Sequence, residues 1–144
     1  MKGVSGSGRD AEAVAAFLLD SDIIIDALNH RRGRRELLRD LTLQNHVLGC
    51  CSVNVTEVCS GMLPAEEGRT GQLLAGLVCY EVTRPIAWQA GLWRREYLRR
   101  GRTLSLADVT IAAVALAHGL TLVTNNVKDY PMPDIRLLVP PANN

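Results

Sequence analysis

The chain has 144 residues and a net charge of +1, with 47% apolar and 22% charged residues. This length suits one compact domain with a single core, and the small net charge excludes a strong overall attraction to nucleic acid. No apolar run approaches the roughly 18 residues that a membrane-spanning helix needs, and no secretory signal pattern is present. The composition therefore predicts a cytoplasmic protein with no membrane segment.

A Gly- and Ser-rich beginning predicts a flexible tail over residues 1–15, and residues 16–144 are expected to form a single domain. In this domain short apolar runs alternate with helical patterns. Strands are expected at 17–19, 47–51, 77–82, 121–123 and 135–139. Helices are expected at 23–28, 34–43, 66–77, 85–100 and 106–118, with another starting at 55–61. Because the strands are apolar on both faces, the pattern predicts an α/β fold, a three-layer sandwich around a central parallel sheet of about five strands.

The helix expected at 85–100 has an apolar face, which includes Trp93 and Tyr97. This spacing favours core or dimer contacts for both rings over a role in stacking on bases. Arginines are concentrated in two clusters that suit contacts with phosphates, although solvated helix faces explain them as well. The clusters are Arg31, Arg32, Arg34 and Arg35, and Arg94, Arg95, Arg99, Arg100 and Arg102.

The cysteines and histidines show no metal-binding spacing. The cysteines form no C-x-x-C pair, which favours buried, reduced thiols. They are Cys50, Cys51, Cys59 and Cys79. The histidines are too far apart for a zinc motif, so we expect them on the surface or in loops. They are His30, His46 and His118.

Acidic and amide side chains follow the ends of several expected strands. In chain order they are Asp20, Asp22, Glu57, Asp108, Asn126 and Asp129. Asp108 differs slightly from the others, because it lies in the first turn of the helix expected at 106–118. The carboxyl ends of parallel strands meet at one edge of a sheet, so we expect these side chains to gather in one cleft.

Helix capping offers a simpler explanation for individual acids. Glu57 and Asp108 match the last position of capping boxes, and Asp22 could cap the helix expected at 23–28. Asp20 ends an apolar strand, where a capping role is less natural. Several acids at one edge repel each other unless a cation neutralises them. Oxygen ligands without nearby His or Cys suit Mg²⁺ or Mn²⁺.

Four segments resemble, in order, the four motifs of the PIN-domain family. They are residues 18–25, 55–61, 104–113 and 122–130. The first is a buried strand ending in Asp20, and the second places Glu57 on a helix four residues before Gly61. Each motif alone is weak, but together they cover most of the chain after the tail. The combination is particularly similar to the VapC toxins of toxin–antitoxin pairs.

The resemblance implies a metal-dependent endoribonuclease. Asp20, Glu57 and Asp108 map onto the three best-defined acids of the family and would hold Mg²⁺ or Mn²⁺. The fourth acid of the family maps onto Asn126, an amide, which leaves tight binding of a second ion in doubt. Asp129, three residues later, is either a substitute acid or a structural cap. In addition, Ser21 and Thr124 either donate hydrogen bonds to the acids or form turns.

The chemistry expected of such a site is hydrolysis of RNA with water as the nucleophile, leaving 5′-phosphate and 3′-hydroxyl ends. The arginine clusters would hold flanking phosphates, so activity should weaken with salt. The resemblance also implies a homodimer and a cognate antitoxin that inserts a peptide into the acidic cleft. It does not identify the RNA: transfer, ribosomal and messenger RNA all stay open.

Two alternatives stay open at this stage. One is a catalytically silent, RNA-binding or regulatory PIN domain, suggested by the amide at Asn126. The other is a phosphatase of the haloacid dehalogenase type, which also begins with an apolar strand and D-x-D, here Asp20 and Asp22, and uses a Thr like Thr124. The phosphatase also needs a further Lys and a late acidic pair, for which little chain follows Thr124.

Overall fold

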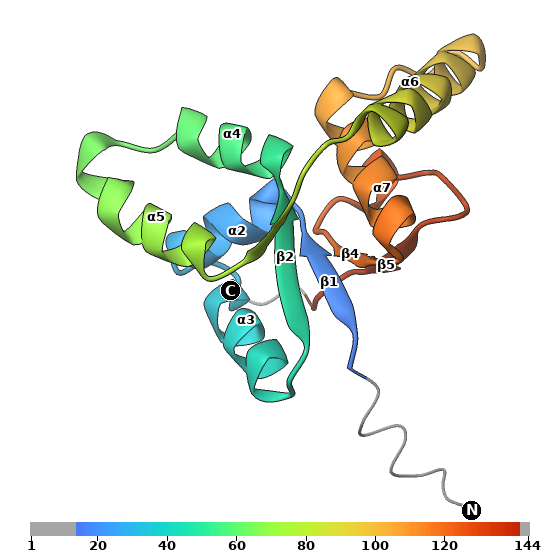
Figure 1. Ribbon diagram of the computed structural model, residues 1–144. Coiled ribbons are helices and arrows are strands. Elements are labelled where there is room, and N and C mark those ends of the chain that lie inside the picture. The colour runs from blue at the N-terminus through green and yellow to red at the C-terminus, as the bar shows by residue number, and fades with distance from the viewer. Residues whose placement is uncertain (1–13, 142–144) are drawn as a thin grey trace, which may run out of the picture.

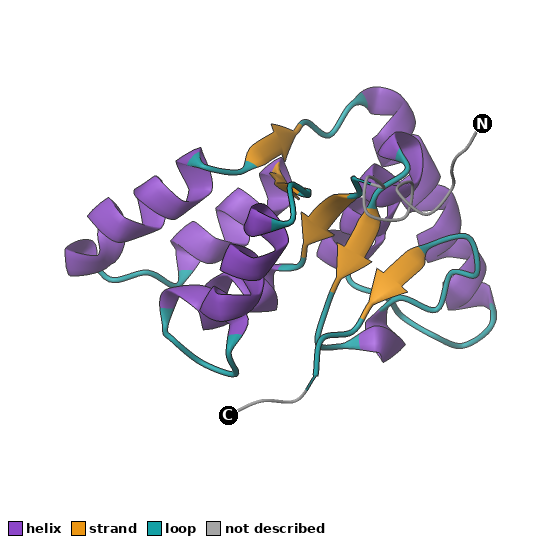
Figure 2. Ribbon diagram, turned by 90° about the horizontal axis from the view of Figure 1, so that it is seen from below, coloured by secondary structure: helices purple, strands orange, loops and turns teal. Residues whose placement is uncertain are grey.

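A five-stranded parallel sheet forms the centre of the computed structural model, which describes residues 14–141, and helices cover both of its faces (Figures 1 and 2). The strands are β1 (Ala16–Leu19), β2 (Val47–Cys51), β3 (Val78–Tyr80), β4 (Thr121–Val123) and β5 (Arg136–Leu138). Their order across the sheet is β3-β2-β1-β4-β5, and all neighbouring pairs are parallel. The predicted three-layer α/β sandwich is therefore confirmed.

The helices agree with the sequence pattern, with differences mainly at their ends. They are α2 (Ser21–Leu28), α3 (Arg34–Leu43), α4 (Ser52–Ser60), α5 (Glu67–Ala75), α6 (Arg84–Arg99) and α7 (Leu106–His118), with short 3₁₀ turns η1 (Pro64–Glu66) and η2 (Val127–Asp129). Helix α7 ends as expected at Gly119, which adopts a left-handed conformation with φ of 63°. None of the helices between residues 14 and 141 combines the length and the apolar character needed to cross a membrane.

Each face of the sheet has its own apolar core. On one face, Leu18 and Leu122 pack with α6 and α7, and on the other Leu19 and Val123 pack with α2 and α3. Successive side chains of a strand point to opposite faces, so a strand covered on both sides is apolar throughout. This burial explains why the strands are continuous apolar runs in the sequence.

The middle of β2 contains a glycine because β3 approaches it closely. A Cβ atom at Gly49 would lie 2.6 Å from Cε2 of Tyr80 and 2.9 Å from the carbonyl oxygen of Val78. The missing side chain leaves room for the Tyr80 ring on the sheet. Gly49 therefore allows the edge strand β3 to pair with β2 in its observed register, in which Gly49 lies opposite Val78.

The expectation of buried cysteines is half correct. Cys50 and Cys51 are fully buried in β2, whereas Cys59 and Cys79 are exposed. The prediction is wrong for these two because Cys59 lies on an outer face of α4 and Cys79 on β3, a strand at the edge of the sheet. All of them are free thiols.

The remaining expectations for single side chains agree with the structure. His30 and His118 are exposed, and His46 lies in the turn before β2. Tyr97 is buried in the core on α6, and Trp93 packs against the same core. Residues 1–13, most of the predicted tail, lie outside the described residues. At its end, the Ala15 backbone N–H donates to Nδ1 of His46 at 3.0 Å.

Candidate active site

The turn from β1 into α2 places Asp20 at the carboxyl edge of the sheet. Oδ1 of Asp20 accepts a hydrogen bond from the backbone N–H of Ser21 at 2.8 Å, which makes Asp20 the N-cap of α2. Two expectations are therefore wrong: Asp20 does cap a helix, and Asp22 does not. The helix begins directly after the strand, so Asp22 falls in its first turn. Capping uses one carboxylate oxygen of Asp20 and fixes the direction of the other.

The second oxygen of Asp20 faces β4. It accepts a hydrogen bond from Oγ1 of Thr124 at 2.8 Å, and Thr124 is completely buried. Asp20 itself is only 7% exposed, and this burial raises the pKa of its carboxyl to about 6. The hydrogen bonds from Thr124 and Ser21 lower the pKa, whereas the negative charge of Asp108 raises it further. Thr124 thus has the donor role considered for it.

Glu57 is joined to α2 by a chain of hydrogen bonds. Oγ of Ser21 donates to Oε1 of Glu57 at 2.6 Å, and Nδ2 of Asn54 donates to Oγ of Ser21 at 2.9 Å. The capping reading is wrong for Glu57: Asn54 occupies the third position of α4, and its Oδ1 accepts from the backbone N–H of Cys51 at 2.8 Å. Glu57 lies one turn further on, so its carboxylate is available at the edge of the sheet.

Asp108 reaches the same edge from the first turn of α7. Its backbone N–H donates to Oγ of Ser105 at 3.0 Å, so Ser105 caps this helix as its sequence pattern suggested. Burial raises the pKa of the Asp108 carboxyl, and the negative charges of Asp129 and Glu57 raise it further. These interactions indicate that Asp108 lies within electrostatic reach of Asp20, Glu57 and Asp129.

Tyr130 is part of the site, although the sequence pattern alone does not single it out. Its side chain is 3% exposed, and its hydroxyl donates to Oδ1 of Asp108 at 3.3 Å. The hydroxyl also lies near enough to Asp20 to lower the pKa of that carboxyl. Burial and the two carboxylates raise the pKa of Tyr130 far above its usual range, so this phenol stays protonated. In the sequence, Tyr130 follows Asp129 directly at the end of the fourth motif, which could have indicated a role in the site. A single aromatic residue at that position is equally typical of the core.

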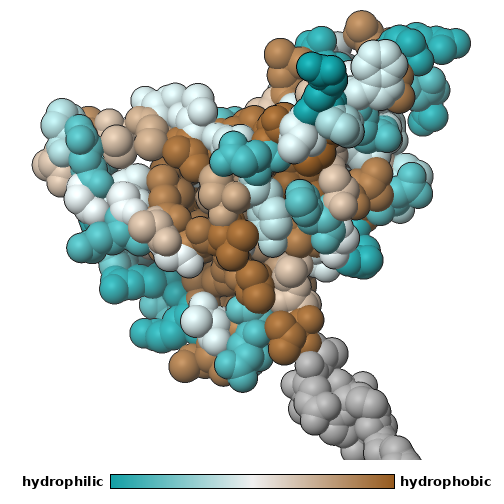
Figure 3. Space-filling view, in the orientation of Figure 1, coloured by the Kyte–Doolittle hydropathy of each residue, from teal (hydrophilic) through white to brown (hydrophobic). Residues whose placement is uncertain are grey.

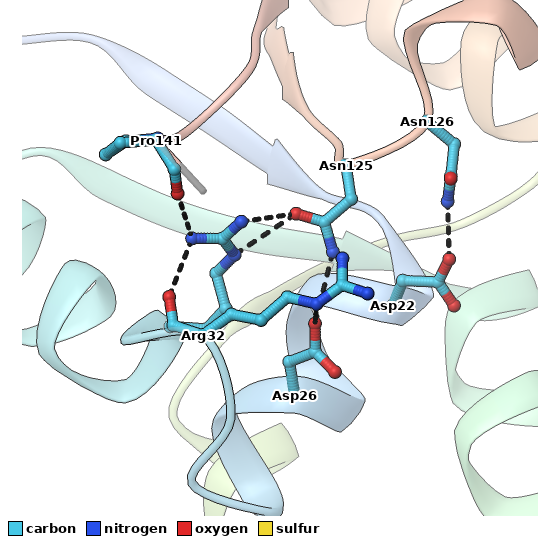
Figure 4. A network of polar contacts seen from close by, with 7 residues as sticks. Asp22, Asp26, Arg32, Asn125, Asn126 and Pro141 are labelled. Carbon is cyan, nitrogen blue, oxygen red and sulfur yellow. Dashed lines mark hydrogen bonds and ion pairs between the residues drawn. The ribbon is translucent and has the colours of Figure 1, made fainter. Parts of the chain in front are cut away.

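Asn126 lies to one side of these acids. Its Nδ2 donates to Oδ2 of Asp22 at 2.6 Å (Figure 4), and its backbone N–H donates to Oγ1 of Thr124 at 2.9 Å. Asp129 lies in η2, close enough to raise the pKa of Asp108. The structure therefore brings Asp129 toward the acid group, whereas Asn126 pairs with Asp22.

The donor set fits a hard divalent cation in its chemistry. In residues 14–141, no salt bridge neutralises the acids of the site, which are Asp20, Glu57, Asp108 and Asp129. Carboxylate oxygens without nearby imidazole or thiolate are the ligands that Mg²⁺ and Mn²⁺ prefer. Over the same residues, no three His, Cys, Asp or Glu side chains are already spaced closely enough to surround one ion.

A buried arginine anchors the loop beside the site. Arg34 is 3% exposed, and its Nε and one terminal nitrogen donate to Oδ1 of Asn125 at 3.1 and 2.7 Å. Its other terminal nitrogen donates to the carbonyl oxygens of Arg32 and Pro141, each at 2.9 Å. Asn125 in turn donates to Oδ2 of Asp26 at 3.1 Å (Figure 4). Including Arg34 in a phosphate-binding cluster was therefore wrong, because its guanidinium is used inside the fold.

The second arginine cluster borders the acids. Arg94 on α6 donates to the carbonyl oxygen of Leu104 at 2.9 Å, just before α7. Arg102 donates to the carbonyl oxygen of Lys128, the neighbour of Asp129. Arg102 thus lies next to η2, which carries Asp129, and Arg94 contacts the segment that leads into α7 and Asp108.

Comparisons with known proteins agree with this arrangement. A model of the PIN domain matches residues 17–129. Ribonuclease VapC10 of Mycobacterium tuberculosis is 34% identical over 116 residues, which cover 81% of this chain and 86% of the relative. Ribonuclease VapC2 of Rickettsia felis is 24% identical over 119 residues, which cover 79% of this chain and 89% of the relative.

Solved structures show the same fold. VapBC2 of Rickettsia felis, bound to a DNA fragment from its promoter, superposes with a TM-score of 0.74 and 24% identity, covering 85% of this chain and 97% of that chain. A toxin–antitoxin complex from Klebsiella pneumoniae superposes with a TM-score of 0.68 and 27% identity, covering 85% of this chain and 95% of that chain. The match over residues 17–129 includes both segments that suggested a haloacid dehalogenase and favours the PIN domain instead.

Proposed function

Since the chain belongs to the PIN-domain family, we propose that it is a VapC-type toxin, an endoribonuclease that depends on Mg²⁺ or Mn²⁺. The observation that carries this proposal is the convergence of carboxylates from three parts of the chain on one edge of the sheet, without a basic partner among the described residues. The relatives that match most of the chain are named ribonucleases, and RNA is the proposed substrate.

We assign Asp20, Asp108 and Glu57 as the metal-binding residues. These residues would hold a divalent cation, which would make a bound water a stronger nucleophile and neutralise charge on the phosphoryl oxygens. Thr124 and Ser21 hold Asp20 and Glu57 in place through the hydrogen bonds described above.

We place the remaining polar groups around this centre. Asp129 acts as an additional acid next to Asp108, and Asn126 orients Asp22 or the substrate at the side of the site. The arginines at the end of α6 bind the phosphates that flank the scissile bond. Hydrolysis by water leaves 5′-phosphate and 3′-hydroxyl ends, and the rate should fall as salt concentration rises.

Mapping RNA ends after brief induction tests this function. The wild type should arrest growth and produce new 5′-phosphate ends at defined sites. Asp108→Asn should lower cleavage at least about 100-fold, because Lewis-acid stabilisation is worth several kcal/mol and each 1.36 kcal/mol changes the rate tenfold. Asp134→Asn, an exposed acid outside the matched segment, is the control and should cleave like the wild type.

Two results would contradict the proposal. New RNA ends that appear equally with wild type and Asp108→Asn would assign the cleavage to another nuclease. RNA binding by the purified wild type without cleavage in Mn²⁺ would favour the catalytically silent PIN domain.

We further propose that an antitoxin binds the groove between α3 and α5, rather than the acidic cleft alone. The groove has a volume of about 780 Å³ and lies where apolar side chains gather in Figure 3. Its apolar lining includes Leu38, Leu48, Leu73 and Leu77. Its basic lining includes His30, Arg35, Arg39 and Arg69. An apolar floor with a basic rim suits an amphipathic helix that carries acidic residues.

Escape from the antitoxin tests this surface. Co-expression of the cognate antitoxin should relieve the growth arrest caused by the wild type. Arg35→Glu combined with Arg39→Glu should still arrest growth but resist rescue, because both substitutions place acid on the basic rim. Arg136→Glu is the control, because Arg136 lies on β5, the edge strand opposite β3 and away from the groove. The antitoxin should rescue growth with this variant as it does with the wild type. Full rescue of the double variant would place the antitoxin elsewhere.

The other proposed partner is a second copy of the chain. Trp88 and Leu98 on α6 and Leu106 on α7 are 71%, 54% and 67% exposed. A contact between two copies of the chain would bury these exposed apolar side chains. We therefore propose a homodimer in which α6 and α7 take part.

A further inference from the structure

The hydroxyl of Tyr130 affects two acids of the site, because it lowers the pKa of both Asp20 and Asp108. The ring packs in the core under α7, where Tyr130 belongs to the same apolar cluster as Val109 and Leu122. The hydroxyl donates to Oδ1 of Asp108 at 3.3 Å and lies near enough to Asp20 to lower the pKa of that carboxyl. A buried ring therefore holds a polar group against the Asp108 carboxylate and near that of Asp20, two acids from distant parts of the chain.

The two acids are held in different ways. Asp20 has both oxygens occupied by donors within its own edge of the sheet, Oδ1 by the backbone of Ser21 and Oδ2 by Thr124. Asp108 stands on the first turn of α7, a half-buried position, and Oδ1 of its carboxylate accepts the hydrogen bond from Tyr130. The hydrogen bond from Tyr130 uses Oδ1 of Asp108, so Oδ2 does not take part in this contact.

A phenol has one hydrogen to donate, and it can accept hydrogen bonds in addition. A donor that bonds to one oxygen of a carboxylate orients the group and stabilises its charged form. Both effects favour binding of a cation by the second oxygen. The packed ring thus fixes the position of the hydroxyl, and the hydroxyl in turn orients the Asp108 carboxylate for binding a cation.

We propose that Tyr130 is a positioning residue for the metal site: its hydroxyl turns the Asp108 carboxylate toward Asp20, so that both acids bind the same divalent cation. This inference rests on the proposed metal-dependent function. It adds a residue that neither the acidic motifs nor the capping patterns identify.

Binding of Mn²⁺ to the metal-free chain, without RNA, tests the inference. Tyr130→Phe keeps the ring and removes the hydroxyl, and it should weaken Mn²⁺ binding about 10-fold, the scale found when partners of metal ligands are removed. Tyr97→Phe is the matched control, because Tyr97 is also buried in this core but lies on α6. It should bind Mn²⁺ like the wild type. Urea unfolding should show that both variants fold.

The outcomes separate this inference from the function on which it rests. Equal Mn²⁺ affinity of wild type and Tyr130→Phe overturns the role of Tyr130 and leaves the metal site intact. A wild type that binds no Mn²⁺ overturns the metal site itself.

A measurement on the unaltered chain covers the case in which Tyr130→Phe fails to fold. Addition of Mg²⁺ should shift the ring resonances of Tyr130 in NMR spectra and leave those of Tyr97 unchanged. An unshifted Tyr130 ring at saturating Mg²⁺ would overturn the proposal.

Discussion

Asp20→Asn is expected to abolish RNA cleavage and, at the same time, to stabilise the metal-free protein. Cleavage should fall at least about 1,000-fold, because the substitution removes a charged oxygen from the proposed metal site, whose contribution to the rate is worth several kcal/mol. Stability should rise because Asp20 is nearly buried and carries a charge that burial disfavours. Asn can still cap α2, so the helix keeps its first hydrogen bond.

The gain in stability should depend on pH. Burial raises the pKa of Asp20 from 3.8 in the unfolded chain to about 6 in the fold, so the folded state binds this proton more tightly. The corresponding stabilisation is present below pH 4 and is lost as pH rises to about 6. At pH 8 the lost stabilisation amounts to at most about 3 kcal/mol, and Asp20→Asn, which cannot ionise, should recover part of it.

Urea unfolding in EDTA at pH 4 and pH 8 measures this effect. The variant and the wild type should have similar free energies of unfolding at pH 4, and the variant should be more stable at pH 8. Mn²⁺ should then stabilise the wild type and not the variant, since a ligand stabilises only a state that binds it. Asp40→Asn, an exposed acid on α3, is the control. A variant that is less stable than the wild type at both pH values would contradict the interpretation.

Arg34→Met is expected to cause the largest loss of stability among single substitutions of charged residues outside the acid group. The guanidinium makes four hydrogen bonds while nearly buried. Its loss leaves the amide oxygen of Asn125 and the carbonyl oxygens of Arg32 and Pro141 without this donor. It also removes the positive charge near Asp26. Breaking a buried charged network of this kind costs about 3–5 kcal/mol.

Thermal or urea unfolding of Arg34→Met checks this expectation, with Arg35→Met as the matched control. Arg35 is the next residue of α3, but it is exposed, and its only side-chain hydrogen-bond partner among the described residues is the His30 ring. Its replacement should change the free energy of unfolding by no more than about 0.5 kcal/mol. Similar losses in both variants would mean that the Arg34 network contributes little.

The regular elements of this protein could be predicted from its sequence because they depend on local patterns. The helix at Arg34–Leu43, the strand at Val47–Cys51 and the helix at Leu106–His118 have the expected bounds. The starts of α2 and α4 were misplaced because a helix can begin directly after a strand when a polar side chain caps it, as Asp20 and Asn54 do here. Apolar periodicity alone does not show such a start.

The partners of side chains could not be predicted in the same way. Arg34 looks like its arginine neighbours in the sequence, and only the loop after β4 and the segment after β5 make it a buried residue. Tyr130 looks like an ordinary core aromatic, and its role depends on where α7 places Asp108. In both cases the partner is distant in sequence, so the contact exists only in the folded chain.

The position of β4 next to β1 has a consequence for synthesis of this protein. Strand β1 pairs with β2 on one side and with β4 on the other, so Asp20 receives its hydrogen bond from Thr124 only when β4 is in place. A nascent chain that has emerged from the ribosome only as far as α6 carries Asp20 and Glu57 but neither Asp108 nor Tyr130. The acidic centre therefore assembles only after most of the polypeptide has been translated.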